Sequence, residues 1–181
     1  MKIIVTGDTH GRLKKISEIL LKTESVDKII HCGDFYDDGK KIQELTGIPV
    51  VGVRGNCDDY QGPETAVLDT PAGRIIAVHG NHYGCDPLRL SYLAEENNAA
   101  MVCYGHTHMA LKTNCGGITV LNPGSLELPR DGSGGTYAIV IATEDGFTAN
   151  IVKYSTVCGT SEKTETKKGK LRDMLNYSDG F

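Results

Sequence analysis

Two histidines stand one residue apart in the segment VCYGHTHMA, where His106 and His108 follow Gly105. In an extended backbone, side chains two residues apart leave the same face, so we expect both rings to reach one small volume. Neutral imidazoles are common ligands of transition metals. The pair therefore predicts a metal site and directs attention to other ligand types in the chain.

Further side chains of the ligand type follow the other apolar runs. Asp8 and His10 follow KIIVTG, Asp34 follows KIIHCG, Asn56 follows VGVRG, and His79 ends IIAVH. Because ligands bind at the carboxyl ends of strands in open α/β sheets, we expect these loops to converge on one site. The glycines that precede four of the loops are expected to let the chain turn sharply as it leaves the sheet.

Each of these residues alone has an ordinary explanation in a turn or an exposed loop. Together they supply two carboxylates, one amide oxygen and four imidazoles. That set of oxygen and nitrogen ligands is about what two divalent ions need.

The apolar pattern predicts the elements that position these loops. The runs KIIV, KIIHC, PVVGV and AMVCY have the continuous apolar character of buried strands in a parallel sheet. Helices are expected over residues 12–23 and 86–97, and a shorter helix is expected to end near Gly47. Residues 66–80, 110–121 and 136–154 have the pattern of hairpins, the last turning at Asp145-Gly146. The sequence thus predicts two packed sheets with outer helices.

Composition favours one globular domain. The chain has 181 residues, of which 39% are hydrophobic and 23% are charged, enough for one domain with a sizeable core. We expect this domain over residues 1–155. Residues 156–181 are polar and are expected to form a tail or a short helix, with the run EKTETKKGKLR as a solvated face.

Charge and cysteine content exclude several classes of protein. The formal net charge of −4 argues against a broad nucleic-acid surface, which is usually basic. No apolar run is long enough for a secretory segment or a membrane span, so a cytoplasmic protein without membrane contact is expected. The six cysteines include no CxxC pair, which argues against a structural zinc site and a disulfide framework.

The motifs GDTH, HCGD, RGNCD, VHG, YGHTH and NPGS, which run from about Met1 to Tyr154, resemble those of the calcineurin-like metallophosphoesterases and of their small phosphodiesterase branch. The resemblance implies an α/β fold, a four-layer αββα sandwich of two mixed β-sheets flanked by helices. It also implies a dinuclear metal centre. One ion would be bound by Asp8, His10, Asp34 and His108, and the other by Asp34, Asn56, His79 and His106. Asp34 would then bridge both ions.

The same resemblance implies a phosphodiesterase that cleaves small phosphate diesters by attack of a metal-bridging hydroxide. Two divalent ions outweigh the charge of two carboxylates, which also favours an anionic phosphate ester as substrate. The ligands fit Mn, Ni, Fe, Co or Zn, and the identity of the ions stays open. A phosphomonoesterase or nucleotidase with the same metals, and a weakly active protein-interaction scaffold of this fold, are the alternatives. Relatives are often dimers or larger, so a homo-oligomer is also open.

Three residues are candidates for catalytic roles, namely Asn56, His79 and His82. The first two would act through the ions that they bind. His82 lies in VHGNHYG, and it is either an exposed loop residue at the rim or a group that contacts the substrate or transfers a proton. Residues 80–82 look like the family's Gly-Asn-His motif, but the order and spacing after Asp34 favour Asn56 as the amide ligand.

Cys57 departs from the pattern of many relatives, which have a histidine after the ligating asparagine. That histidine is thought to stabilise the phosphoryl oxygen or to protonate the leaving group, so its absence leaves the general acid unassigned. Cys57 is expected to pack, because no neighbouring histidine would activate it as a nucleophile. Arg54 and Asp58 flank the motif and either pair with each other or orient the substrate.

Three further polar residues are expected to support the structure. His31 is expected in the core or behind a ligand carboxylate. Asn122 and Ser125 of LNPGS are expected to fix a turn.

Overall fold

Two five-stranded sheets pack face to face in the structure, a computed structural model that describes residues 1–159. The first sheet has the order β10-β9-β1-β2-β3. Its strands are β1 (Lys2–Thr6), β2 (Lys28–His31), β3 (Val50–Gly52), β9 (Thr136–Thr143) and β10 (Gly146–Lys153). The strands β1, β2 and β3 run parallel, whereas β9 is antiparallel to β1 and β10. The sheet is therefore mixed.

The second sheet has the order β4-β5-β6-β8-β7 and is also mixed. Its strands are β4 (Thr65–Thr70), β5 (Gly73–Val78), β6 (Ala99–Cys103), β7 (Ala110–Cys115) and β8 (Ile118–Pro123). The strands β5, β6 and β8 run parallel, and the hairpin partners β4 and β7 are antiparallel to them.

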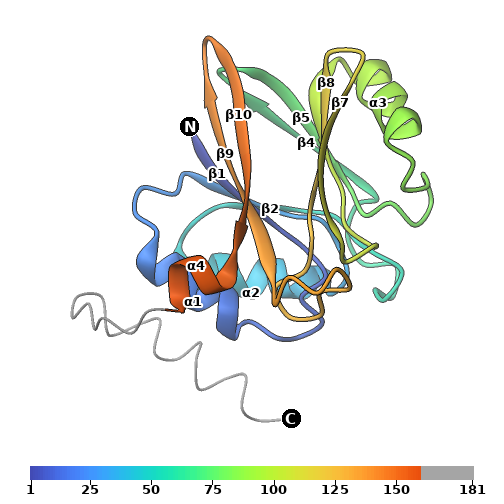
Figure 1. The fold of residues 1–181 in the computed structure, drawn as a ribbon. Helices are drawn as coiled ribbons and strands as arrows, with labels where there is room; N and C mark the ends of the chain where they lie inside the picture. Colours follow the sequence, from blue (N-terminus) through green and yellow to red (C-terminus); the bar gives the residue numbers. More distant parts are fainter. Residues whose placement is uncertain (160–181) are drawn as a thin grey trace.

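Helices cover the outer face of each sheet (Figure 1). The helices α1 (Lys14–Lys22), α2 (Tyr36–Thr46) and α4 (Tyr154–Cys158) lie on the first sheet, and α3 (Pro87–Glu96) lies on the second. Three apolar clusters fill the spaces between these four layers: one between the sheets and one under each helical layer. Among the helices of residues 1–159, none has both the length and the apolar character needed to cross a membrane.

The helix ends follow the local sequence. The side chain of Asp86 accepts a hydrogen bond from the Arg89 N–H and caps α3, which begins with Pro87. Gly47 ends α2 in a left-handed conformation with φ of 72°, and its N–H donates to the Gln43 carbonyl. Both helix ends had been predicted from these residue types, and the structure confirms them.

The sandwich of two mixed sheets is confirmed, with two corrections to its details. The run AMVCY was predicted to share a parallel sheet with the three earlier runs, but β6 lies in the second sheet. The β9–β10 hairpin turns at residues 144–145, one position earlier than predicted, because Gly146 already pairs with Thr143. The predicted domain boundary at residue 155 stays a prediction: α4 spans it, and residues 160–181 lie outside the described residues.

Candidate metal centre

Five loops from both sheets converge at one end of the sandwich. The loops after β1, β2 and β3 carry Asp8, His10, Asp34 and Asn56, and the loops after β5 and β6 carry His79, His106 and His108. In every case the loop leaves the carboxyl end of its strand. Convergence of loops at this edge was predicted, but two packed sheets provide the edge rather than one.

Four of these side chains form the first group: Asp8, His10, Asp34 and His108. Each offers one ligand atom, and these atoms all lie within 4.8 Å of one another. The His10 Nε2 lies 3.6 Å from Asp34 Oδ2 and 3.4 Å from His108 Nε2, and His108 Nε2 lies 3.5 Å from Asp8 Oδ1. Two carboxylates and two imidazoles thus face one small volume.

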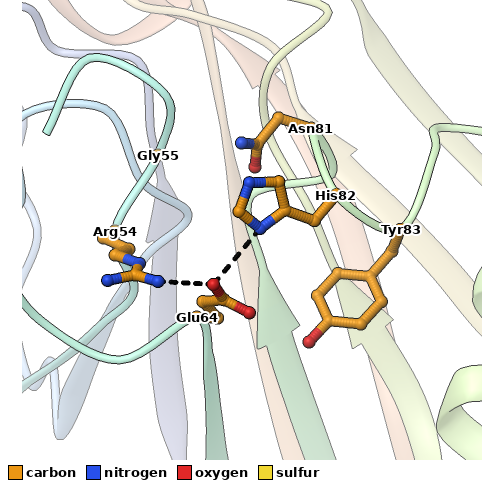
Figure 2. A pocket seen from close by; sticks show the side chains of 6 residues that line it. All are labelled: Arg54, Gly55, Glu64, Asn81, His82 and Tyr83. Atoms are coloured by element: carbon orange, nitrogen blue, oxygen red, sulfur yellow. Dashed lines mark hydrogen bonds and ion pairs between the residues drawn. The ribbon is translucent and has the colours of Figure 1, made fainter. Parts of the chain in front are cut away.

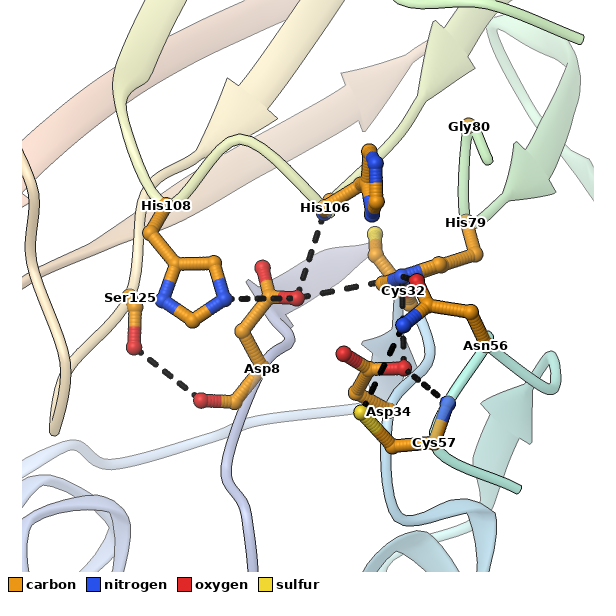
Figure 3. A network of polar contacts seen from close by, with 12 residues as sticks. Asp8, Cys32, Asp34, Asn56, Cys57, His79, Gly80, His106, His108 and Ser125 are labelled. Carbon is orange, nitrogen blue, oxygen red and sulfur yellow. Dashed lines mark hydrogen bonds and ion pairs between the residues drawn. The ribbon is translucent and has the colours of Figure 1, made fainter. Parts of the chain in front are cut away.

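The second group lies on the other side of Asp34 (Figure 3). The His79 Nε2 lies 3.3 Å from Asp34 Oδ1 and 3.1 Å from Asn56 Oδ1. The ring of His106 meets the ring of His79 edge-on, with centroids 5.0 Å apart. The two oxygens of Asp34 therefore face different groups, with Oδ2 toward His10 and Oδ1 toward His79.

The backbone of the ligand loops differs from the predicted one. His106 and His108 are left-handed rather than extended, with φ of 67° and 58°, and their rings lie on either side of Asp8 (Figure 3). Asp8, His10 and Asp34 also have positive φ. Non-glycine residues rarely adopt this conformation, which concentrates at functional sites when the surrounding structure enforces it.

The glycine before Asn56 has a different role from the predicted turn. A Cβ on Gly55 would lie 2.1 Å from Asp34 Oδ1, so this residue is needed for close approach of two loops. Only Gly33, of the four glycines that precede the loops, has positive φ, at 91°. Its added Cβ would also lie 2.7 Å from His79 Nδ1. Space for the ligands thus explains these glycines better than chain reversal does.

Backbone carbonyls fix the tautomers of two histidines. The Nδ1 atoms of His79 and His108 each lie 2.8 Å from a carbonyl oxygen, that of Cys32 and that of Leu128. A carbonyl can only accept, so Nδ1 carries the hydrogen and Nε2 presents its lone pair to the site. Burial lowers the pKa of both rings, which keeps them neutral. Both histidines therefore have the form that binds metal.

The carboxyl group of Asp8 has no cationic partner within residues 1–159 that would stabilise its ionised form. It is fully buried, and its Oδ2 has no hydrogen-bond partner. Burial, followed by the neighbouring carboxylate of Asp34, raises the pKa of Asp8 to about 8. Within residues 1–159, neither carboxylate pairs with a lysine or an arginine. Divalent cations would supply the missing positive charge, so the donor set fits the ions that the motifs imply.

A buried network beneath His10 was not predicted. The Asp38 Oδ2 accepts hydrogen bonds from the Thr9 hydroxyl at 2.7 Å and from the Gly11 N–H at 2.8 Å, on either side of His10. The Thr9 hydroxyl also lies 3.0 Å from His31 Nε2, so His31 lies behind a ligand loop, as one prediction proposed. Asp38 stands four residues before the buried Ile42 on α2, and a carboxylate on that apolar face was the available signal.

The LNPGS turn supports two ligand loops. Ser125 donates to the Asp8 carbonyl at 3.0 Å, and its hydroxyl oxygen accepts from the N–H groups of residues 127 and 128. Asn122 donates to the Gly105 carbonyl at 2.8 Å and accepts from the Gly124 N–H. The prediction that both side chains fix a turn is confirmed.

The RGNCD loop is held by contacts within the protein. Asp58 accepts from the N–H groups of Gly55 and Tyr36, and Arg54 pairs with Glu64, so the proposed pairing of Arg54 with Asp58 does not occur. Cys57 is exposed rather than packed, and its N–H donates to Asp34 Oδ1 at 3.0 Å. Partial desolvation of this exposed residue's thiol, followed by the hydrogen bond with Asp34, raises the pKa of Cys57 to about 11, which disfavours a thiolate nucleophile.

The side chain of His82 is exposed, and its role at the rim of the site stays a prediction. Its Nδ1 lies 3.3 Å from Glu64 Oε1 at a small pocket (Figure 2). Sequence reasoning gave no signal for Glu64, because the residue lies outside every motif.

Comparisons with known proteins find similar phosphoesterases. A family model, the calcineurin-like phosphoesterase superfamily domain, matches residues 1–145. The probable metallophosphoesterase YsnB of Bacillus subtilis is 32% identical over an alignment of 154 residues, and the match covers 82% of this chain and 88% of YsnB. The phosphodiesterase YfcE of Escherichia coli is 26% identical over an alignment of 166 residues, and the match covers 77% of this chain and 87% of YfcE.

The fold is also that of a solved relative. A crystal structure of a predicted phosphoesterase from Streptococcus pneumoniae has a TM-score of 0.72 and 31% identity, and the match covers 85% of this chain and 90% of the other. Together with the family model and the motifs, this likeness shows that the chain belongs to the calcineurin-like phosphoesterase superfamily.

Proposed function

We propose that the protein is a metal-dependent phosphodiesterase that holds two divalent ions and hydrolyses small phosphate diesters. The observation that carries the proposal is the position of Asp34 between two groups of ligand atoms. Its Oδ2 lies 3.6 Å from His10 Nε2, and its Oδ1 lies 3.3 Å from His79 Nε2. A carboxylate in this position suits a bridge between two ions.

Seven side chains would hold the ions: Asp8, His10, Asp34, Asn56, His79, His106 and His108. When bound, a pair of Mn, Ni, Fe, Co or Zn ions supplies Lewis acidity and lowers the pKa of water, which allows attack on phosphorus at neutral pH. The protein contributes two carboxylates and four imidazoles, of which those of His79 and His108 have fixed tautomers. Asn56 and His79 thereby take part in catalysis as ligands.

One feature favours water as the nucleophile, and another favours a diester substrate. The pKa of Cys57 is raised to about 11, so its thiol stays protonated at neutral pH and is a poor nucleophile. The relative YfcE carries the name phosphodiesterase, and the match with it extends over 77% of this chain. We therefore assign the chain to diester hydrolysis rather than to a phosphomonoesterase or scaffold role.

Metal content and substrate preference test the proposal together. The purified protein should bind two ions per chain by elemental analysis after loading with Mn²⁺. Turnover of bis(p-nitrophenyl) phosphate should exceed turnover of p-nitrophenyl phosphate by roughly tenfold or more, because the leaving group is the same and only the second ester differs. Preference for the monoester would favour a nucleotidase. Two bound ions without turnover of either ester would favour a scaffold.

A further inference from the structure

A small pocket opens between the loop that leads into Asn56 and the loop that follows His79 (Figure 2). Its lining residues are Arg54, Gly55, Glu64, Asn81, His82 and Tyr83. Residues 54 and 55 of this lining come directly before Asn56 in the chain, and residues 81–83 come shortly after His79. These two ligands touch, with Asn56 Oδ1 at 3.1 Å from His79 Nε2. The cavity volume of about 10 Å³ leaves room for one water-sized group next to the proposed metal centre.

Three charged or titratable side chains form a chain along this pocket. Arg54 donates a short hydrogen bond to Glu64 Oε1, and His82 Nδ1 lies 3.3 Å from the same oxygen. The guanidinium of Arg54 holds the pKa of Glu64 below its usual value, so the carboxyl group is ionised at neutral pH. An ionised carboxylate only accepts hydrogen bonds. The Nδ1 of His82 therefore carries the hydrogen.

This arrangement leaves the other ring nitrogen of His82 free to exchange a proton. In Figure 2 the second nitrogen lies on the Asn81 side of the ring, away from Glu64. The side chain of His82 is 57% exposed, so solvent can return a proton to it. An exposed ion pair of this kind contributes little to stability. The pair of Glu64 and His82 instead orients the imidazole ring of His82.

We propose that His82 protonates the leaving oxygen of the diester and that Glu64 is a positioning residue that orients its ring. The inference rests on the proposed phosphodiesterase function and names the general acid that the sequence GNCD leaves unassigned. Of the residues that line the pocket, His82 is the one with an imidazole, the side chain that most often serves as a general acid in enzymes.

The proposed step is balanced. The oxygen of water forms a bond to phosphorus while the bond from phosphorus to the departing ester oxygen breaks and leaves its electron pair on that oxygen. The imidazolium of His82 gives its Nε2 proton to this oxygen, which departs as an alcohol. A proton released by the attacking water passes to solvent, and solvent returns one to the imidazole.

Three diesters with the same retained group and different leaving groups test this role. An alkoxide leaving group needs a proton, whereas a p-nitrophenolate or an alkylthiolate departs readily as an anion. His82→Gln should lower kcat for the alkyl diester by roughly 10²-fold, and it should lower kcat for the other two by no more than about twofold. Glu64→Gln should lower kcat for the alkyl diester by about tenfold, with the same selectivity.

A matched control comes from another exposed ion pair. Asp69→Asn removes the carboxylate that pairs with Arg74 at 3.0 Å, at the far end of β4, and it should change none of the three rates. Equal losses on all three diesters in the folded His82→Gln variant would overturn the inference, as would unchanged rates. A wild-type protein that binds two ions and cleaves none of the diesters would instead overturn the proposed function.

Discussion

At the scale of single residues, Asp34 is the side chain on which both groups of ligand atoms depend. We expect Asp34→Ala to lower metal content from two ions per chain toward none, because the bridge belongs to both sites. Turnover should fall by roughly 10³-fold or more. Elemental analysis and diester hydrolysis on the same preparation measure both effects.

Asp37 provides a matched control for this substitution. It is an exposed carboxylate of α2 that pairs with Lys40 at 2.7 Å, and Lys40 is not a candidate ligand. Asp37→Ala should keep two ions and full turnover. If Asp34→Ala also kept both, the bridging role would be wrong.

Residue types and spacing predicted the seven candidate ligands but not their backbone. The sequence indicated that His106 and His108 belong to one site, because two imidazoles in GHTH are ligand types. It gave no sign of their left-handed φ values, since that conformation is enforced by neighbours such as the Asp8 carboxylate, which accepts from the His106 N–H at 3.1 Å. Local patterns therefore identified the chemistry, and distant contacts determined the geometry.

At the scale of elements, β2, α2 and the loop after β1 are joined through a buried histidine. His31 is fully buried, and burial lowers its pKa from 6.5 to about 4. Between pH 6.5 and pH 4 the unfolded chain binds a proton at this residue that the folded chain does not. The contribution of His31 to folding stability is therefore present above pH 6.5 and is lost as the pH falls toward 4, by up to about 3 kcal/mol.

Urea unfolding of the wild type and of His31→Gln measures this effect. At pH 7.5 the variant should be less stable, because its contact with Thr9 is altered. As the pH falls to 4, the difference in free energy of unfolding should shift by about 3 kcal/mol in favour of the variant. Other titrating groups, including Asp8, are common to both proteins and cancel in the difference. A difference that stays constant with pH would mean that His31 is protonated alike in both states.

The order of the elements along the chain was predictable, but their assignment to sheets was not. Continuous apolar runs indicate buried strands, and Asp86-Pro87 and Gly47 indicate helix ends. The run AMVCY has the same character as KIIV, although β6 and β1 lie in different sheets. A strand that is covered on both faces has the same apolar sequence pattern in either sheet. Only the long-range pairing of β6 with β5 and β8 assigns it to the second sheet.

At the scale of the whole molecule, the candidate ligands come from loops of both sheets, so bound ions would join the two halves of the sandwich. Each ion that binds only the folded chain stabilises it by about 2.7 kcal/mol at a hundredfold excess over Kd. For a chain of this size, the removal of each ion should lower Tm by roughly 5–10 °C. Differential scanning calorimetry with and without EDTA measures the shift.

The same experiment on Asp34→Ala gives the control. That variant should melt at one temperature whether or not EDTA is present. If the wild type also showed no shift, then either no ion is bound or binding does not depend on the fold.

The place of β1 in its sheet has a consequence for how the protein is made. Ile4 of β1 pairs with Ile29 on one side and with Ile139 on the other. On a ribosome, the first partner of β1 emerges early, whereas β9 emerges only after every other strand except β10 has been synthesised. Until then one edge of β1 presents unpaired N–H and C=O groups, which are prone to pair with other chains. Folding of the nascent chain is therefore expected to finish late, and a chaperone that covers this edge would improve the yield of native protein.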